Sequence, residues 1–358
     1  MKLFPGLFRR KKEAFGLDIG SSAVKLVQLA PAGRGYRLRT FAVVSLPPET
    51  IGEGTIKDPA TVVKAIRHAV SQAEVDERDA VIAVSGRELI VKQLQLPQVS
   101  PKELDDAILL EAEHHIPFAI DEVYLDYQVV RRATNGSHTM DVLLVAVKKS
   151  KVNEYVAVVE EAGLNPVVVD VDAFALENQF ELNYPEMVAE TAALIDVGAS
   201  VMKTNVIRGG VSLFVRDIAF GGNNFTQAIA QRLNVPFPKA DAVKRGDDTS
   251  VKWDDVVPAL EAVSRELSLE VQRTFDYFAS TVESERVSRI VLSGGSARLA
   301  GLDRYLSSSW GIPVEVANPF QSVEVDPERF DVEGLVTTGP ALAVAVGLGI
   351  RCPGDEPR

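Results

Sequence analysis

"FGLDIGSSAVKLVQL" (residues 15–29) and "ALIDVGASVMKTNVI" (residues 193–207) are two copies of one pattern. In each copy an apolar run meets an aspartate, a glycine and a hydroxyl residue, and a second run carries a lysine. The matched positions are Asp18 with Asp196, Gly20 with Gly198, Ser22 with Ser200, and Lys25 with Lys203. The copies lie 178 residues apart in a chain of 358, so one belongs to each half. The pattern predicts a duplicated architecture in which strand, bend, strand and hairpin recur.

The composition is typical of soluble globular proteins, with 46% hydrophobic and 25% charged residues. A chain of this length exceeds one ordinary core, so we expect two lobes. The net charge of −12 argues against nucleic-acid binding through a positive field. The single cysteine, Cys352, provides no disulfide framework and favours a cytoplasmic location. The basic N-terminus leaves two alternatives open, a membrane-surface contact and a solvated tail.

Strand patterns alternate with helical patterns along the chain, which predicts the α/β class. We expect six segments in chain order: an N-terminal tail (1–13), the first part of lobe I (14–86), an inserted subdomain (87–164), the second part of lobe I (165–190), lobe II with a helical subdomain at about 224–285 (191–338), and a C-terminal helix that returns to lobe I (339–358). The inserted subdomain has few elements. We therefore expect it to lack a core of its own and to pack on lobe I.

The repeated bend has the chemistry of a phosphate-binding loop. A glycine beside the bend lets backbone N–H groups approach an anion, and Ser21 and Ser22 add donors. Lys25 is a candidate charge partner for a phosphate, whereas Asp18 alone would repel one. A Mg²⁺ ion held through water between Asp18 and the phosphate resolves that conflict, with Asp196 as the opposite wall. Either loop alone is explained equally well as a tight turn, but two copies favour a binding site.

A third glycine turn follows a buried strand at Gly294, Gly295 and Ser296. It permits flat contact with an adenine and its nearest phosphate, although strand–Gly-Gly–helix is also common as a structural turn. The turn does not fit the dinucleotide pattern G-x-G-x-x-G. The sequence has no Gly-Lys dipeptide, which excludes a P-loop.

The order of these motifs resembles the actin, heat-shock-chaperone and sugar-kinase superfamily over about residues 14–351. Within it, "KEAFGLDIGSSAVKLVQL", "LPQVSPKELDDAILLEAEHHIPF" and "AFGGNNFTQAIAQRL" resemble the PilM family of type IV pilus assembly. The insertion is similar to the relocated subdomain of the division protein FtsA. The resemblance implies an actin-like (ribonuclease H-like, duplicated) fold with two lobes around a nucleotide cleft, which holds ATP and Mg²⁺.

The resemblance also assigns residues. It implies three sets of nucleotide-binding residues: Asp18, Gly20, Ser21, Ser22 and Lys25 on the first loop; Asp196, Gly198, Ala199 and Ser200 on the second; and Gly221, Asp241, Lys244, Gly294, Gly295, Ser296 and Leu299 on the adenosine side. Relatives carry glutamate at the position of Asp241. Asp172 stands where relatives carry the Glu-Pro that orients the hydrolytic water. Because aspartate is one methylene shorter, we expect slow or negligible hydrolysis; the alternative role for Asp172 is a helix N-cap.

The resemblance implies partners as well. We expect a scaffold that binds the N-terminal cytoplasmic peptide of the inner-membrane protein PilN and connects it to other pilus assembly and motor proteins. This places the protein at the cytoplasmic face of the inner membrane, attached through its partners. Two alternatives remain open at this point: a polymerising FtsA-like cytoskeletal protein, and a small-molecule kinase of the same superfamily.

Overall fold

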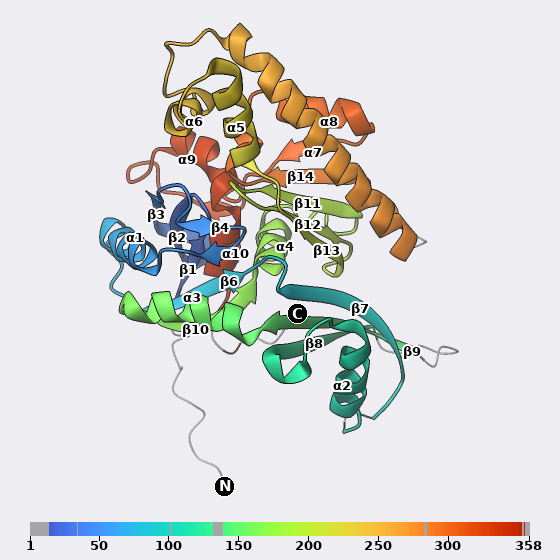
Figure 1. The fold of residues 1–358 in the computed structure, drawn as a ribbon. Helices are drawn as coiled ribbons and strands as arrows, with labels where there is room; N and C mark the ends of the chain where they lie inside the picture. The colour runs from blue at the N-terminus through green and yellow to red at the C-terminus, as the bar shows by residue number, and fades with distance from the viewer. Residues whose placement is uncertain are drawn as a thin grey trace.

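The computed structural model describes residues 14–33, 35–100, 102–131, 139–282, 285–352 and 354. Two mixed sheets form the centres of the two lobes (Figure 1). The first has the order β10-β6-β1-β2-β3-β16, and the second has the order β13-β12-β11-β14-β15. The class is therefore α/β, as predicted.

The two sheets share one construction. The strands of the first are β1 (Phe15–Ile19), β2 (Ala23–Ala32), β3 (Gly35–Ser45), β6 (Asp79–Val84), β10 (Asn165–Val171) and β16 (Val323–Glu324). Those of the second are β11 (Ala192–Val197), β12 (Met202–Ile207), β13 (Ser212–Ile218), β14 (Arg289–Ser293) and β15 (Val314–Val316). β1 pairs antiparallel with β2 and parallel with β6, and β11 pairs antiparallel with β12 and parallel with β14. The sequence repeat is thus also a structural repeat.

Helices cover both faces of each sheet. The first lobe carries α1 (Pro59–Gln72), α3 (Lys149–Glu161), α4 (Asp172–Asn183) and α10 (Ala343–Ile350). The second carries α5 (Gly222–Leu233), α6 (Phe237–Arg245), α7 (Trp253–Thr281) and α8 (Leu302–Trp310). α7 has the bounds that its apolar stripe predicts, because Val256, Leu260, Val263, Leu267 and Val271 recur at helical spacing and are all buried. Helices on both faces explain why β1 and β11 are buried along their whole length.

Among the described residues, one segment, Val332–Ile350, is long and apolar enough to cross a membrane. It consists of α9 (Val332–Thr338), a 3₁₀ turn (Gly339–Leu342) and α10, and 61% of its most apolar stretch is buried inside the protein. α10 packs on α4 so closely that a Cβ at Gly347 would overlap the carbonyl of Ala175. On the other side, a Cβ at Gly16 would overlap the carbonyl of Ala345. These contacts make α10 a core helix of the first lobe.

The insertion contains β7 (Leu89–Pro97), α2 (Leu104–His115), a 3₁₀ turn (Ile120–Glu122), β8 (Val123–Arg131) and β9 (Thr139–Lys148), with strand order β7-β9-β8. It has a hydrophobic core of its own that includes Leu96, Ile108 and Val142. Our expectation that it lacks a core was wrong, because a helix on a three-stranded sheet buries enough apolar surface. The sequence has an Asn135-Gly136 dipeptide between β8 and β9, which is typical of a hairpin turn, but these two residues lie outside the described ones.

α3, which the sequence analysis placed in the insertion, packs elsewhere. Its Val152, Tyr155 and Val159 belong to the same core cluster as Phe15 and Leu17 of β1. The first lobe therefore includes this helix, and we propose that the inserted subdomain ends near residue 148. In Figure 1 the insertion projects from the first lobe, and its strand β7 also contacts β13 of the second lobe.

Candidate functional site

The first phosphate loop is the bend between β1 and β2. The Gly20 N–H donates to the carbonyl of Ala23 (3.0 Å), which closes a tight turn. Asp18 lies opposite Lys25 in the hairpin register, and the Lys25 Nζ lies 2.8 Å from Asp18 Oδ2. Both side chains are largely buried, whereas Ser22 is exposed at the tip of the bend. The loop thus presents a neutralised Asp–Lys pair beside an open backbone turn.

The second phosphate loop repeats this geometry between β11 and β12. The Gly198 N–H donates to the carbonyl of Val201 (3.1 Å), and Asp196 lies opposite Lys203. The Lys203 Nζ lies 3.4 Å from Asp196 Oδ2, while the Ser293 Oγ donates to Asp196 Oδ1 (3.1 Å). Ser293 ends β14, the strand beside β11. Asp196 is therefore fixed by two donors from neighbouring strands.

Asp172 connects the lobes. It is the first residue of α4, and the Lys203 Nζ lies 2.9 Å from its Oδ2. The N-cap residue of α4 is Val171, and Asp172 is already the first helical residue, so the N-cap interpretation was wrong. Burial raises the pKa of Asp172, but the Lys203 ammonium and hydrogen bonds from Lys203 and Ser85 outweigh it and leave the pKa below its ordinary value. Asp172 is consequently ionised at neutral pH.

Lys203 bridges two buried carboxylates and is the charged centre of the site. Burial lowers its pKa, but Asp172, Asp196 and Asp18 together raise the pKa well above its ordinary value. The contact between Lys203 of the second lobe and Asp172 at the start of α4 brings the two lobes together beside the second loop. Lys203 is not among the site residues predicted from the sequence. It could have been found there, because it occupies the place of Lys25 in the repeat.

Backbone contacts dock the start of α5 onto the second loop. The Gly222 N–H donates to the carbonyl of Gly198, and the Asn223 N–H donates to that of Ala199, both at 2.8 Å. A Cβ at Gly221 would lie 2.6 Å from the carbonyl oxygens of Gly198 and Ala199, so glycine is required there. Ser200 is held from the same helix, because the Asn223 Nδ2 donates to its Oγ (3.0 Å).

The Gly-Gly turn after β14 also packs against the second phosphate loop. Gly294 has φ +87°, and a Cβ there would overlap the Val197 backbone. The Ser296 Oγ donates to the carbonyl of Gly198 (3.4 Å), which ties the turn to the second loop. In contrast, a Cβ built at Gly295 would meet no heavy atom within 4 Å. Gly295 therefore presents bare backbone to an open space.

α6 supplies the remaining polar wall. The Lys244 Nζ contacts Asp241 Oδ1 (2.8 Å), Thr226 Oγ1 (2.7 Å) and the carbonyl of Gly222 (3.2 Å). Burial raises the pKa of Asp241, but the hydrogen bond and charge of Lys244 outweigh it and lower the pKa below its ordinary value. Leu299 lines a pocket of about 220 Å³ between α5, α7 and α8, together with Phe225.

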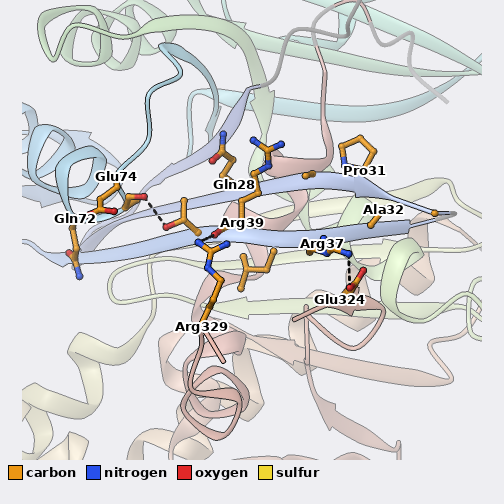
Figure 2. A pocket seen from close by; sticks show the side chains of 14 residues that line it. Gln28, Pro31, Ala32, Arg37, Arg39, Gln72, Glu74, Glu324 and Arg329 are labelled. Atoms are coloured by element: carbon orange, nitrogen blue, oxygen red, sulfur yellow. Dashed lines mark hydrogen bonds and ion pairs between the residues drawn. The ribbon is translucent and has the colours of Figure 1, made fainter. Parts of the chain in front are cut away.

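A separate groove of about 710 Å³ lies on the first lobe, between β2, β3, the end of α1 and residues 324–329 (Figure 2). The Arg37 Nη2 lies 2.8 Å from Glu324 Oε1, and the Arg329 Nη2 donates to the carbonyl of Arg39 (3.3 Å). Its lining residues on β2 begin at Gln28, six residues beyond the bend at Ser22. At about 3.3 Å per residue this is roughly 20 Å, so the groove does not belong to the phosphate loops.

Comparisons with known proteins identify the family of the chain. A family model described as "Type IV pilus assembly protein PilM" matches residues 16–352. A solved structure, "PilM-PilN type IV pilus biogenesis complex", contains a chain that is 32% identical, with a TM-score of 0.85, and the match covers 95% of this chain and 98% of that one.

More distant relatives share the fold. The cell division protein FtsA of Escherichia coli K12 is 23% identical, over 94% of this chain and 90% of FtsA. The crystal structure of MreB5 of Spiroplasma citri bound to ADP has a TM-score of 0.52 at 13% identity, and the match covers 95% of each chain. The fold is therefore actin-like, as the motifs predicted. The extent of the family match shows that this chain belongs to the PilM family of type IV pilus assembly proteins.

Proposed function

We propose that this protein is an ATP-binding scaffold of the type IV pilus assembly machinery. The observation that carries the nucleotide part is the pair of matching hairpin bends, one from each lobe, each of which holds an Asp–Lys pair beside a tight backbone turn. Repeated loops of this kind accept the phosphates of a nucleotide from both sides. The similarity to MreB5, whose structure holds ADP, supports the same use of the cleft here.

The residues fit a nucleotide. Gly221 and Gly294 allow the start of α5 and the Gly-Gly turn to pack directly against the backbone of the second loop, while Gly295 leaves open backbone for adenosine. Ser296 and Lys244 meet beside Gly222, where they border the adenosine side. The exposed hydroxyl of Ser22 lies at the bend of the first loop, where it is available to a phosphate.

The residues fit a Mg²⁺ ion that is bound mainly by phosphates and water, with few direct protein ligands. Among the described residues, no group of three or more acidic, histidine or cysteine side chains forms a metal cage. Lys25 already pairs with one oxygen of Asp18, and Asp196 accepts from Lys203 and Ser293. These carboxylates suit an ion bound mainly by phosphates and water, which is how proteins commonly hold Mg²⁺. We propose that Asp18 and Asp196 hold it through water, and that the ion would neutralise phosphate charge.

We propose that hydrolysis is slow. A general base must be free to accept a proton from water. Asp172 is instead ion-paired with Lys203 at 2.9 Å, and its lowered pKa makes it a weak base. The same ion pair disfavours the small-molecule kinase alternative, because a kinase on this fold requires a competent base at the end of the phosphate chain.

We propose that the partner is the N-terminal cytoplasmic peptide of PilN, and that the complex connects to other assembly and motor proteins at the cytoplasmic face of the inner membrane. The similarity to the chain in the PilM-PilN complex supports this partner. We place this peptide between the first lobe and the insertion, because extended segments commonly bind where two domains meet. The alternative function is that of a polymerising FtsA-like cytoskeletal protein, which the similarity to FtsA supports.

The partner is tested with a fluorescent peptide of about ten residues from the PilN tail of the same organism. We expect saturable binding by anisotropy, competed by unlabelled peptide and not by a scrambled one. Sedimentation with and without ATP tests the alternative. Particles that grow with ATP, together with no peptide binding, would contradict the scaffold and favour the polymer.

A further inference from the structure

Lys203 is a largely buried lysine with spare hydrogen-bonding capacity. Its Nζ lies 2.9 Å from Asp172 Oδ2 and 3.4 Å from Asp196 Oδ2, and its side chain is 12% exposed. An ammonium group has three N–H donors. Within the described part of the chain, these two carboxylates are its hydrogen-bonding or ion-pair partners. One donor is therefore available to a ligand in the cleft.

The direction of a bound nucleotide follows from the ends of the site. Lys244 and the start of α5 border the adenosine side, and the Gly198 carbonyl contacts both Gly222 and Ser296 there. From that corner the phosphate chain has to pass Gly198 toward Asp196, which lies two residues earlier on β11. The last phosphate then reaches the point where Asp196 and Asp172 approach each other, and Lys203 occupies that point.

Charge makes the lysine necessary there. Without Lys203, a terminal phosphate would lie beside the ionised carboxylates of Asp172 and Asp196. Neighbouring negative charges repel strongly in a poorly solvated site. Lys203 neutralises part of both and presents its own charge to the phosphate. Asp172 fixes the position of that ammonium, because its contact is the shorter of the two.

We propose that Lys203 binds the terminal phosphate of ATP, with Asp172 as its positioning residue, so that the cleft distinguishes ATP from ADP. This inference rests on the proposed ATP-binding function. It assigns Asp172 a role other than general base. It also explains why one repeat position carries lysine in both halves: Lys25 and Lys203 approach the phosphates from opposite lobes.

The test measures affinities for ATP and ADP by calorimetry at constant Mg²⁺, and compares their ratio between variants. The main variant is Lys203→Met combined with Asp172→Asn, because removing the lysine alone would leave two buried carboxylates unpaired. Lys203→Gln with Asp172→Asn is a second, more polar version in case the first fails to fold. Asp172→Asn alone keeps the lysine, and Lys57→Met removes the same charge from a surface pair with Glu49.

We expect the preference for ATP over ADP to fall at least about tenfold in the double variants, since a charge-assisted hydrogen bond is lost. ADP affinity should change less than about threefold, and Lys57→Met should change neither value. Asp172→Asn alone should lower the preference by an intermediate factor, because the lysine remains but loses the contact that positions it, and an unchanged preference in this variant would overturn the positioning role of Asp172. Equal losses for ATP and ADP, or no change in the ratio, would overturn the role of Lys203. If the wild-type protein binds neither nucleotide, the proposed function itself fails, and the role of Lys203 fails with it.

Discussion

Gly295 offers a substitution that separates folding from nucleotide binding. A Cβ at this position would meet no heavy atom within 4 Å, so Gly295→Ala should leave the free energy of unfolding within about 0.5 kcal/mol of wild type. If adenosine lies against this backbone, the added methyl group overlaps the ligand. Overlaps of this kind cost about 1–3 kcal/mol, which corresponds to a loss of roughly 5- to 150-fold in ATP affinity.

The assay pairs urea unfolding with calorimetric titration of Mg-ATP. Gly35→Ala is the matched control, because its new Cβ would lie 3.7 Å from the carbonyl of Ser322, an ordinary contact on another part of the first lobe. Gly221→Ala is the opposite case, since its Cβ would collide with the Gly198 and Ala199 carbonyls, and it should lose both stability and ATP binding. Wild-type ATP affinity in a folded Gly295→Ala protein would show that the nucleotide does not cross this turn.

Three further predictions concern turnover, the insertion and pH. The Asp172–Lys203 pair predicts phosphate release by the purified protein well below the roughly 1 s⁻¹ lower end of kinase rates, and a rate above this in a phosphate-release assay would contradict the pair's assigned effect. The ends of the insertion lie side by side, because the Lys148 N–H donates to the carbonyl of Glu88 (3.1 Å). Replacing residues 89–147 by Gly-Ser should therefore keep ATP binding and abolish binding of the PilN peptide. Unchanged peptide binding by anisotropy would show that the peptide binds elsewhere. Burial raises the pKa of Glu177 to about 7, so the folded protein holds this proton more tightly than the unfolded chain, and stability is lost as the pH rises from about 4.5 to 7. Glu177→Gln should be more stable than wild type by about 3 kcal/mol above pH 7 and equal to it below about pH 4.5, and a pH-independent difference in urea unfolding would refute this.

Local patterns predicted much of the fold. The bounds of α7 follow from its apolar stripe, and the repeated Asp-Gly bends predicted both hairpins. Each signal lies within one element or between neighbouring strands, where periodicity and turn chemistry decide the conformation. The same locality explains why the sequence alone could nominate candidate site residues: they stand at the ends of strands and the starts of helices.

Long-range packing could not be predicted in the same way. The Lys203–Asp172 contact joins residues on different lobes. It forms only because α4 of the first lobe packs against β12 of the second. The amphipathic pattern of α3 predicts that one face of the helix is buried. It does not predict whether that face packs in the core of the insertion or in that of the first lobe. The separate core of the insertion was not predicted for the same reason, since the positions of apolar residues along the chain do not determine which other residues they pack against.

The central claim is that ATP binds between the two repeated loops and requires both. The most direct measurement is calorimetric titration of Mg-ATP into wild-type protein, Asp18→Asn and Asp196→Asn, with folding of each variant checked by circular dichroism. Each substitution disrupts one Asp–Lys pair on one lobe. We predict binding to wild type and a loss of at least about tenfold in both variants, because each loses the charge support of one wall. Equal affinity in all three folded proteins, or loss in one variant alone, would contradict a site shared by the two lobes.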